Sequence, residues 1–222
     1  MLRTIFFDAA GTLFHLPQSV GYHYALVGER MGLTLDAAAL DRSFAQVWRS
    51  MPVRATTGTP RADDDKNWWA DLVDRVIGQV APAMDKSKRE AFFEAAYSHF
   101  AEPGVWQLYD EVTDVLDQLR GRFPLGIISN FDGRLRVILE HLEISNYFGN
   151  VIISSEVGAD KPDPLIFHRA AELAGVMPGE ALHVGDDRVR DWSGAAAAGF
   201  NVFQLDRPRN SLRDVVTACA RL

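Results

Sequence analysis

Short apolar segments recur along this chain, and their spacing constrains the fold more than any other feature. They occupy residues 4–7, 125–128, 151–153, 181–184 and 201–204. Mainly apolar, β-prone runs of this length, bounded by turn residues, are typical of parallel strands in an α/β sheet. Helical patterns alternate with the last four segments, which implies crossover connections between parallel strands. The sequence therefore predicts an α/β fold with a doubly wound parallel sheet.

A long helical stretch, residues 16–102, interrupts this alternation after the first strand. Apolar residues recur there at helical spacing in four segments, near 20–31, 40–51, 72–80 and 92–100, with a loop predicted over 54–65. Ser87 and Glu90 form a capping-box pattern that predicts the start of the fourth helix. Amphipathic helices bury their apolar faces against one another or against a neighbouring domain. We predict a four-helix cap domain over 16–102, inserted into a core domain of 1–15 and 103–222.

Polar residues that can carry chemistry follow three of the predicted strands. They are Asp8, the pair Ser129-Asn130, and Asp186. The carboxyl ends of parallel strands meet at one edge of the sheet, where open α/β sheets bind ligands. Two carboxylates that converge there repel each other unless a cation lies between them, and oxygen ligands suit Mg²⁺. Lys161, in a loop on the same side, supplies a point charge for a phosphate group.

Each of these residues also has a purely structural explanation. Asp8 can cap the turn after its strand, Ser129-Asn130 can cap the next helix, and Lys161 can be a solvated loop lysine. We interpret Asp191 as support for a loop or helix end, and His183 as a residue packed within its strand. The order and spacing of the whole set nevertheless favour a functional site over coincidence.

The same residues form four motifs in sequence order: Asp8-Ala-Ala-Gly-Thr12, Ile128-Ser-Asn130, Lys161-Pro, and Gly185-Asp-Asp-Arg-Val-Arg-Asp191. Together with the helical insertion, they resemble the haloacid dehalogenase-like (HAD) hydrolase superfamily over the whole chain. Each motif alone is weak, but the combination is specific. The segments Ser129-Asn-Phe-Asp-Gly-Arg-Leu135 and His183-Val-Gly-Asp186 are most similar to the rhythmically-expressed-gene-2-like branch. The resemblance implies a Rossmann-like core and a helical cap.

The resemblance also implies a role for each matching residue. Asp8 would attack phosphorus and form an aspartyl-phosphate that water hydrolyses. Asp8, the backbone carbonyl of Ala10 and Asp186 would hold Mg²⁺. Ser129 would bind phosphate, and Asn130 would assist at the edge of the phosphate. Lys161 would neutralise charge on the nucleophile and the transferring group. The implied activity is a phosphatase that acts on a small phosphorylated metabolite.

Ala10 departs from the family pattern, because family phosphatases carry a second aspartate there as general acid and base. Loss of that group removes proton transfer, an effect of roughly 10²–10⁴-fold. Two alternatives stay open. A haloacid dehalogenase needs no acid at this position, because halide departs unprotonated. A catalytically weak binding or regulatory protein would keep the fold without efficient turnover.

Charge and cysteine content limit the remaining possibilities. The net charge of −7 argues against nucleic acid and anionic membranes as partners. The partner that the resemblance implies is a phosphorylated small-molecule substrate. Cys219 is the only cysteine, so an intrachain disulfide is impossible, and this favours a reducing cytoplasm. The sequence shows neither a signal-peptide pattern nor an apolar run of the ~18 residues that a membrane span requires. Nothing in the pattern assigns an oligomeric state, and a monomer is compatible with it.

Overall fold

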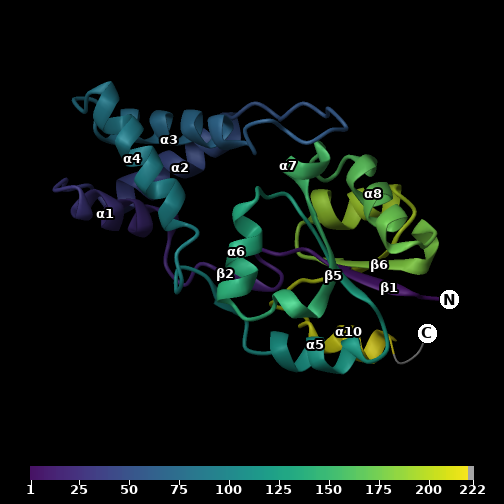
Figure 1. Ribbon diagram of the computed structural model, residues 1–222. Helices are drawn as coiled ribbons and strands as arrows, with labels where there is room; N and C mark the ends of the chain where they lie inside the picture. Colours follow the sequence, from purple (N-terminus) through teal and green to yellow (C-terminus); the bar gives the residue numbers. More distant parts are fainter. Residues whose placement is uncertain (220–222) are drawn as a thin grey trace. The chain divides into compact units, whose positions relative to one another are not determined.

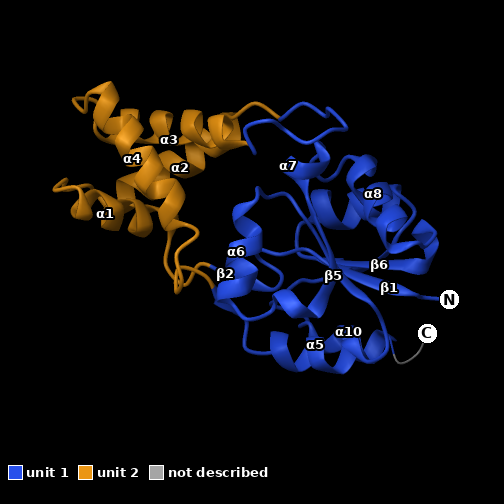
Figure 2. Ribbon diagram, in the orientation of Figure 1, with its two compact units in different colours: residues 1–15, 54–64, 107–222 blue, residues 16–53, 65–106 orange. Residues whose placement is uncertain are grey.

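The computed structural model describes residues 1–219, and the chain divides into two compact units (Figure 2). Unit 1 contains residues 1–15, 54–64 and the chain from 107 onward, whereas unit 2 contains residues 16–53 and 65–106. Among the described residues, no helix combines the length and apolar character needed to cross a membrane.

Unit 1 is built on a five-stranded parallel sheet, in the order β5-β4-β1-β6-β7 (Figure 1). The strands are β1 (Thr4–Phe7), β4 (Leu125–Ser129), β5 (Phe148–Ile153), β6 (Ala181–Gly185) and β7 (Asn201–Gln204). The central strand β1 pairs in parallel with both neighbours, so that Phe7 lies opposite Ile127 on one side and Val184 on the other. The predicted parallel α/β sheet is confirmed.

Helices cover both faces of the sheet, as the doubly wound prediction requires. Figure 1 shows α5 (Val112–Arg120) and α10 (Arg213–Cys219) on one side, and α8 (Pro164–Ala174) on the other. Successive β1 side chains point to opposite faces. Phe6 belongs to the cluster of α8, with its ring 6.2 Å from that of Phe200, whereas Phe7 lies 6.5 Å from Phe148. The sequence predicts a terminal helix over 211–220, of which Ala220 lies outside the described residues.

Shorter elements connect these layers. They are α6 (Arg134–His141), α7 (Ser154–Val157), α9 (Gly194–Ala197), the 3₁₀ helices Ser145–Tyr147 and Pro178–Glu180, and a π-helix at Arg188–Ser193. A two-stranded antiparallel ribbon pairs β2 (Phe14–His15) with β3 (Gln107–Leu108). Each ribbon strand has only two residues, too few for an alternating pattern, and the sequence did not predict it. The chain first leaves unit 1 after β2, and it returns for the last time at β3.

Unit 2 consists of the four predicted helices, α1 (Val20–Arg30), α2 (Ala37–Ser50), α3 (Lys66–Val80) and α4 (Lys86–His99). Their apolar faces form one cluster that includes Tyr24, Leu40 and Phe92. The predicted capping box at Ser87 is wrong. Asp85 is the N-cap of α4, and its carboxylate accepts a 2.9 Å hydrogen bond from the backbone N–H of Lys88. Ser87 already lies inside the helix.

Residues 54–64, which we call the strap, correct the predicted domain boundaries. They separate α2 from α3 in sequence, yet they pack with unit 1. The backbone N–H groups of Thr57 and Arg61 donate to the carbonyls of Gly158 and Ser155, each at 2.8 Å. Arg54 pairs with Asp160 at 2.8 Å.

Two further observations complete this correction. The carboxylate of Asp64 accepts a 2.7 Å bond from the backbone N–H of Gly133, so both ends of the strap are bound to unit 1. At the other boundary, residues 103–106 stay with the helices because the Trp106 indole donates to the carbonyl of Phe100 at 2.8 Å. The predicted continuous range of 16–102 therefore becomes two segments, 16–53 and 65–106.

Candidate active site

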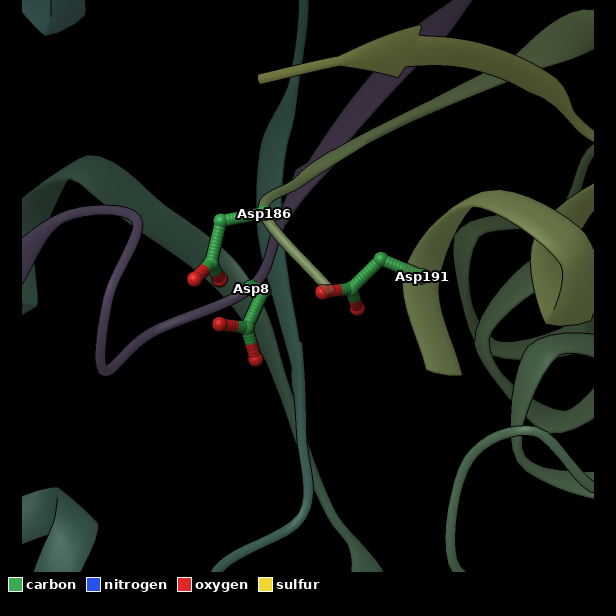
Figure 3. Close-up of side chains that lie close together, drawn as sticks. All are labelled: Asp8, Asp186 and Asp191. Carbon is green, nitrogen blue, oxygen red and sulfur yellow. The ribbon is translucent and has the colours of Figure 1, made fainter. Parts of the chain in front are cut away.

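Three aspartates converge at the carboxyl edge of the sheet (Figure 3). Asp8 follows β1, Asp186 follows β6, and Asp191 lies in the π-helix after β6. Because β1 and β6 are adjacent and parallel, the ends of these strands meet, and the backbone N–H of Asp8 donates to the Val184 carbonyl at 2.8 Å. One carboxylate oxygen from each aspartate lies within 4.8 Å of the others. The structure thus brings together the two predicted acids and adds Asp191.

Lys161 is buried beside this cluster, with only 3% of its surface exposed. Its ammonium group donates to Asp8 Oδ1 and Asp191 Oδ1, both at 2.6 Å, and to the Ile128 carbonyl at 2.9 Å. These bonds use all three ammonium hydrogens. Burial alone would lower the pKa of Lys161, but Asp8 and Asp191 together raise it above its ordinary value. Lys161 is therefore a fixed positive charge beside Asp8, and its role in neutralising a nucleophile stays a prediction.

One ammonium does not balance three carboxylates, and the pKa values reflect this excess. Burial raises the pKa of Asp8 to about 7, with Asp191 and Asp186 adding to the effect that Lys161 opposes. Burial and the neighbouring Asp191 also raise the pKa of Asp186. For Asp191, burial acts upward, but Lys161 and His183 hold its pKa below the ordinary value. Carboxylate oxygens with excess negative charge are a donor set that fits a hard divalent cation. The cluster can hold a metal ion.

Ser129 and Asn130 lie next to this cluster but make different contacts. The Ser129 hydroxyl, at the end of β4, donates to Asp8 Oδ1 over 3.4 Å. The Asn130 side chain instead bonds to the main chain of Lys161. Its Nδ2 donates to the Lys161 carbonyl at 2.9 Å, and its Oδ1 accepts from the Lys161 N–H at 2.6 Å. These paired bonds indicate that Asn130 positions the Lys161 loop, whereas Ser129 contacts Asp8 directly.

The turn after Asp8 brings its backbone close to Asp186. Thr12 donates from its hydroxyl to Asp186 Oδ1 at 3.2 Å. Gly11 has a φ of +95°, and a Cβ atom there would lie 2.7 Å from Asp186 Oδ2, so only glycine fits. Ala10, two residues after Asp8, places a methyl group in this half-buried turn. The role of its carbonyl as a metal ligand stays a prediction.

Sequence reasoning underestimated Asp191 and His183. Asp191 accepts from both Lys161 and His183 Nε2, the latter at 2.9 Å. Burial lowers the pKa of His183, which keeps the imidazole neutral, so its Nε2–H donates to the carboxylate. The five-residue separation between Asp186 and Asp191, within one turn after a strand, was the available signal. His183 is a packed residue, as predicted, and it also orients Asp191.

Comparison with known proteins identifies the class that this fold and site define. Residues 2–199 match the family model of the haloacid dehalogenase-like hydrolases. The match spans most of the chain, and the protein therefore belongs to this family of hydrolases. The resemblance predicted from the four motifs is confirmed.

Two relatives and three solved structures illustrate the range of similar proteins. Haloacid dehalogenase-like hydrolase domain-containing protein 3 of Bos taurus is 34% identical, over 93% of this chain and 83% of that protein. Rhythmically expressed gene 2 protein of Drosophila melanogaster is 29% identical, over 90% of this chain and 81% of that protein. Similar folds occur in the putative HAD-hydrolase YfnB of Bacillus subtilis, a HAD phosphatase of Thermococcus onnurineus and a 2-haloacid dehalogenase of Pseudomonas syringae.

These structures support the fold alone, because their sequences are distant. YfnB has a TM-score of 0.75 at 18% identity, covering 99% of both chains. The phosphatase has a TM-score of 0.68 at 20% identity, covering 98% of both chains. The dehalogenase has a TM-score of 0.67 at 20% identity, covering 100% of this chain and 99% of its own. Phosphatases and dehalogenases thus share this architecture, and the choice between them depends on the site.

Proposed function

We propose that the protein is a Mg²⁺-dependent phosphohydrolase that acts on a small phosphorylated metabolite through an aspartyl-phosphate on Asp8. The observation that carries this proposal is the charge of the cluster. Lys161 pairs with Asp8 and Asp191, and no second cation among the described residues of the cluster offsets Asp186, so three carboxylates face one ammonium at a site that also binds a phosphate in this proposal. A divalent cation would neutralise that excess.

In the proposed reaction, a carboxylate oxygen of Asp8 forms a bond to phosphorus while the bond from phosphorus to the leaving oxygen breaks. The leaving group departs with the electron pair. Lys161 holds Asp8 Oδ1 in place and offsets negative charge, and the Ser129 hydroxyl contacts the same oxygen. Water then attacks the phosphoryl group, which releases phosphate and restores the Asp8 carboxylate. Asp8, Asp186 and the Ala10 carbonyl would hold Mg²⁺. When bound, the ion would supply Lewis-acid stabilisation of the phosphoryl oxygens.

Dehalogenation is the second candidate, and Ala10 is the observation that favours it. A halide leaves without a proton, so alanine at this position would cost such an enzyme nothing. Dehalogenases of this kind act without a metal, however, and would leave the excess carboxylate charge unbalanced. The same alanine also suits a catalytically weak regulatory protein that binds phosphorylated ligands. We rank the dehalogenase below the phosphohydrolase because it leaves the acidic cluster unbalanced. We rank the regulatory protein below it because Asp8, Lys161 and Asp186 are all retained.

A substrate panel with matched variants tests the proposal. Phosphorylated metabolites and 2-haloacids would be assayed with Mg²⁺ and with EDTA, using Asp8→Asn as the blank. We expect phosphate release that requires Mg²⁺, falls to background in Asp8→Asn, and weakens together with Mg²⁺ binding in Asp186→Asn. Trapping of a phosphoryl group on Asp8 would distinguish an enzyme from a binding protein. Halide release that persists in EDTA would overturn the proposal in favour of dehalogenation.

We also propose that the protein acts in the cytoplasm on a small-molecule substrate. The single cysteine, Cys219, is buried and free, which is compatible with a reducing compartment. The net charge of −7 disfavours nucleic acid as a partner. Fractionation of cells that produce the protein checks the location.

A further inference from the structure

Arg207, in the loop after β7, binds the backbone of the turn that follows Asp8. Its Nη2 donates to the Thr12 carbonyl at 2.5 Å, and its Nε donates to the Gly11 carbonyl at 3.3 Å. The guanidinium group is planar and presents several N–H donors in a fixed arrangement. One side chain, nearly two hundred residues away in sequence, thus contacts two consecutive carbonyls of the proposed catalytic turn.

Two neighbours hold the guanidinium in this orientation. Glu111 accepts from Arg207 Nη1 at 2.7 Å, and the two side chains are only 12% and 22% exposed. Burial would raise the pKa of Glu111, but the hydrogen bond from Arg207 keeps it below the ordinary value, so Glu111 is ionised. The Arg207 Cζ also lies 3.3 Å from the centroid of the Tyr109 ring. A cation stacked on an aromatic face and paired with a carboxylate has little rotational freedom.

The same turn contacts Asp186 through other atoms. The Thr12 hydroxyl donates to Asp186 Oδ1 at 3.2 Å, while Gly11 approaches so closely that an added Cβ would meet Asp186 Oδ2 at 2.7 Å. Asp8 is four residues before Thr12 on the same segment. Any displacement of Gly11 and Thr12 would therefore change the spacing between Asp8 and Asp186.

We propose that Arg207 is a positioning residue that sets the geometry of the Mg²⁺ ligands. Its hydrogen bonds to the turn end on backbone carbonyls and not on the carboxylate of Asp8. It fixes the Gly11-Thr12 backbone and thereby the distance between the carboxylates of Asp8 and Asp186. This inference rests on the metal site of the proposed function, and it adds a residue outside the four motifs.

Calorimetric titration with Mg²⁺ alone tests this role in wild type, Arg207→Lys and Arg207→Met. Residues that orient metal ligands typically contribute about 10–100-fold in metal affinity, and we expect the Kd for Mg²⁺ to rise by that factor. Lysine would fail as a substitute because its ammonium does not reproduce the planar, two-carbonyl contact. Arg209→Lys is the matched control: it changes an arginine of the same loop whose side chain is 77% exposed and pairs with Asp206. Its Kd should equal that of wild type.

A second measurement separates positioning from general stability. With p-nitrophenyl phosphate as probe, Arg207→Lys should need more Mg²⁺ for half-maximal activity but recover most of its kcat at saturating Mg²⁺. A loss of kcat at every Mg²⁺ concentration, with an unchanged Kd, would overturn the inference and leave the proposed function standing. If the wild-type protein itself binds no Mg²⁺, both the inference on Arg207 and the proposed Mg²⁺-dependent function fail. If Arg207→Met does not fold, Glu111→Gln replaces it in the titration. An unchanged Kd for Mg²⁺ in both Glu111→Gln and Arg207→Lys would also overturn the inference.

Discussion

A cluster of ionisable side chains is buried in each of the two units, and these two clusters differ in charge balance. In unit 1, the ammonium of Lys161 faces the carboxylates of Asp8 and Asp191, with Asp186 nearby. In unit 2, His23 Nδ1 lies 3.0 Å from His99 Nε2, and His99 Nδ1 lies 2.8 Å from Glu102 Oε2. Both clusters join segments that are far apart in sequence.

The unit 2 cluster is balanced without a ligand. Glu102 pairs with Arg30 at 3.1 Å as well as with His99, so one acid meets one guanidinium at the partly exposed end. Burial, and then the neighbouring His99, lower the pKa of His23, which favours its neutral form. His23 Nε2 has no hydrogen-bond partner among the described residues, and rings of Tyr22 and Phe100 lie 5.4 and 5.5 Å from its ring.

This difference separates a site from a structural network. A chain of neutral and paired groups stabilises the fold by hydrogen bonding and requires no external charge. An excess of carboxylates at a sheet edge destabilises the fold unless a cation arrives. The comparison therefore predicts that changes in the unit 1 cluster alter activity and metal response, whereas changes in the unit 2 cluster alter stability and its pH dependence.

Removal of the Lys161 charge should have the largest effect. Lys161→Met leaves the carboxylates of Asp8 and Asp191 buried without their ammonium, which typically costs about 3–5 kcal/mol of unfolding free energy. Phosphatase activity should be lost as well, because Lys161 contacts the proposed nucleophile. Urea denaturation in EDTA measures the stability change. Lys66→Met is the control, because Lys66 pairs with Glu94 at a largely exposed site, where a loss below about 1 kcal/mol is expected.

Addition of a carboxylate at Ala10 should produce the next largest effect. Ala10→Asp supplies the general acid that family phosphatases keep, a gain of about 10²–10⁴-fold for substrates with alkoxide leaving groups. Aryl and acyl phosphates should gain little, because phenolate and carboxylate depart without a proton. A leaving-group series on wild type and Ala10→Asp, with Asp8→Asn as blank, measures this. A wild type that hydrolyses alkyl phosphates rapidly, without leaving-group dependence, would contradict the account of a missing acid.

His23 tests the unit 2 cluster, and its effect should appear in stability. Below the ordinary pKa of 6.5, the unfolded chain binds a proton at His23 that the folded chain resists, so wild-type stability should fall as pH decreases through this window. His23→Phe should reduce this slope and cost about 1–3 kcal/mol at pH 7, because His99 Nε2 loses its partner. Urea denaturation from pH 5 to 8 measures both effects.

Some acid sensitivity should persist in His23→Phe, because the pKa of the buried His183 in unit 1 is also lowered. His141→Phe, a change at an exposed helix position, is the control variant. An equal reduction of the slope by both variants would mean that the buried cluster has no special role.

The smallest effect is expected at the surface of unit 2, away from its buried cluster. Asp85→Ala removes the N-cap of α4 and should cost about 1 kcal/mol. Ser87→Ala should stay within about 0.5 kcal/mol, because Ser87 lies inside the helix. Thermal unfolding of both variants compares them directly. A larger loss in Ser87→Ala would restore the capping box that the sequence pattern predicts.

The strands and their polar ends could be predicted from the sequence because both depend on local pattern and on one general rule. Apolar runs identified β1, β4, β5, β6 and β7, and the geometry of parallel sheets implied that Asp8 and Asp186 meet. Nothing local revealed the partner of a side chain. The paired bonds of Asn130 to the Lys161 backbone depend on the approach of two loops, and so do the contacts of Arg207.

The sequence predicts a loop at the strap, but its packing with unit 1 could not be predicted, for a related physical reason. Its residues are rich in Thr, Gly, Pro and charge, which is typical of any exposed loop. Its assignment to unit 1 comes from backbone bonds to Ser155 and Gly158 and from ion pairs of Arg54 and Arg61 with Asp160. Partners a hundred residues away leave no periodic signal in the segment itself.

The strap also affects how such a protein can be recombined. The chain passes between the two units four times, after residues 15, 53, 64 and 106, and not twice as a simple insertion would. A hybrid gene that exchanges residues 16–106 as one cassette would therefore bring a foreign strap against Asp160, Ser155 and Gly133 of the host. Exchange in two pieces, 16–53 and 65–106, keeps those contacts native. Any exchange of the helical unit is thus constrained at its middle, where the host domain keeps eleven residues of its own.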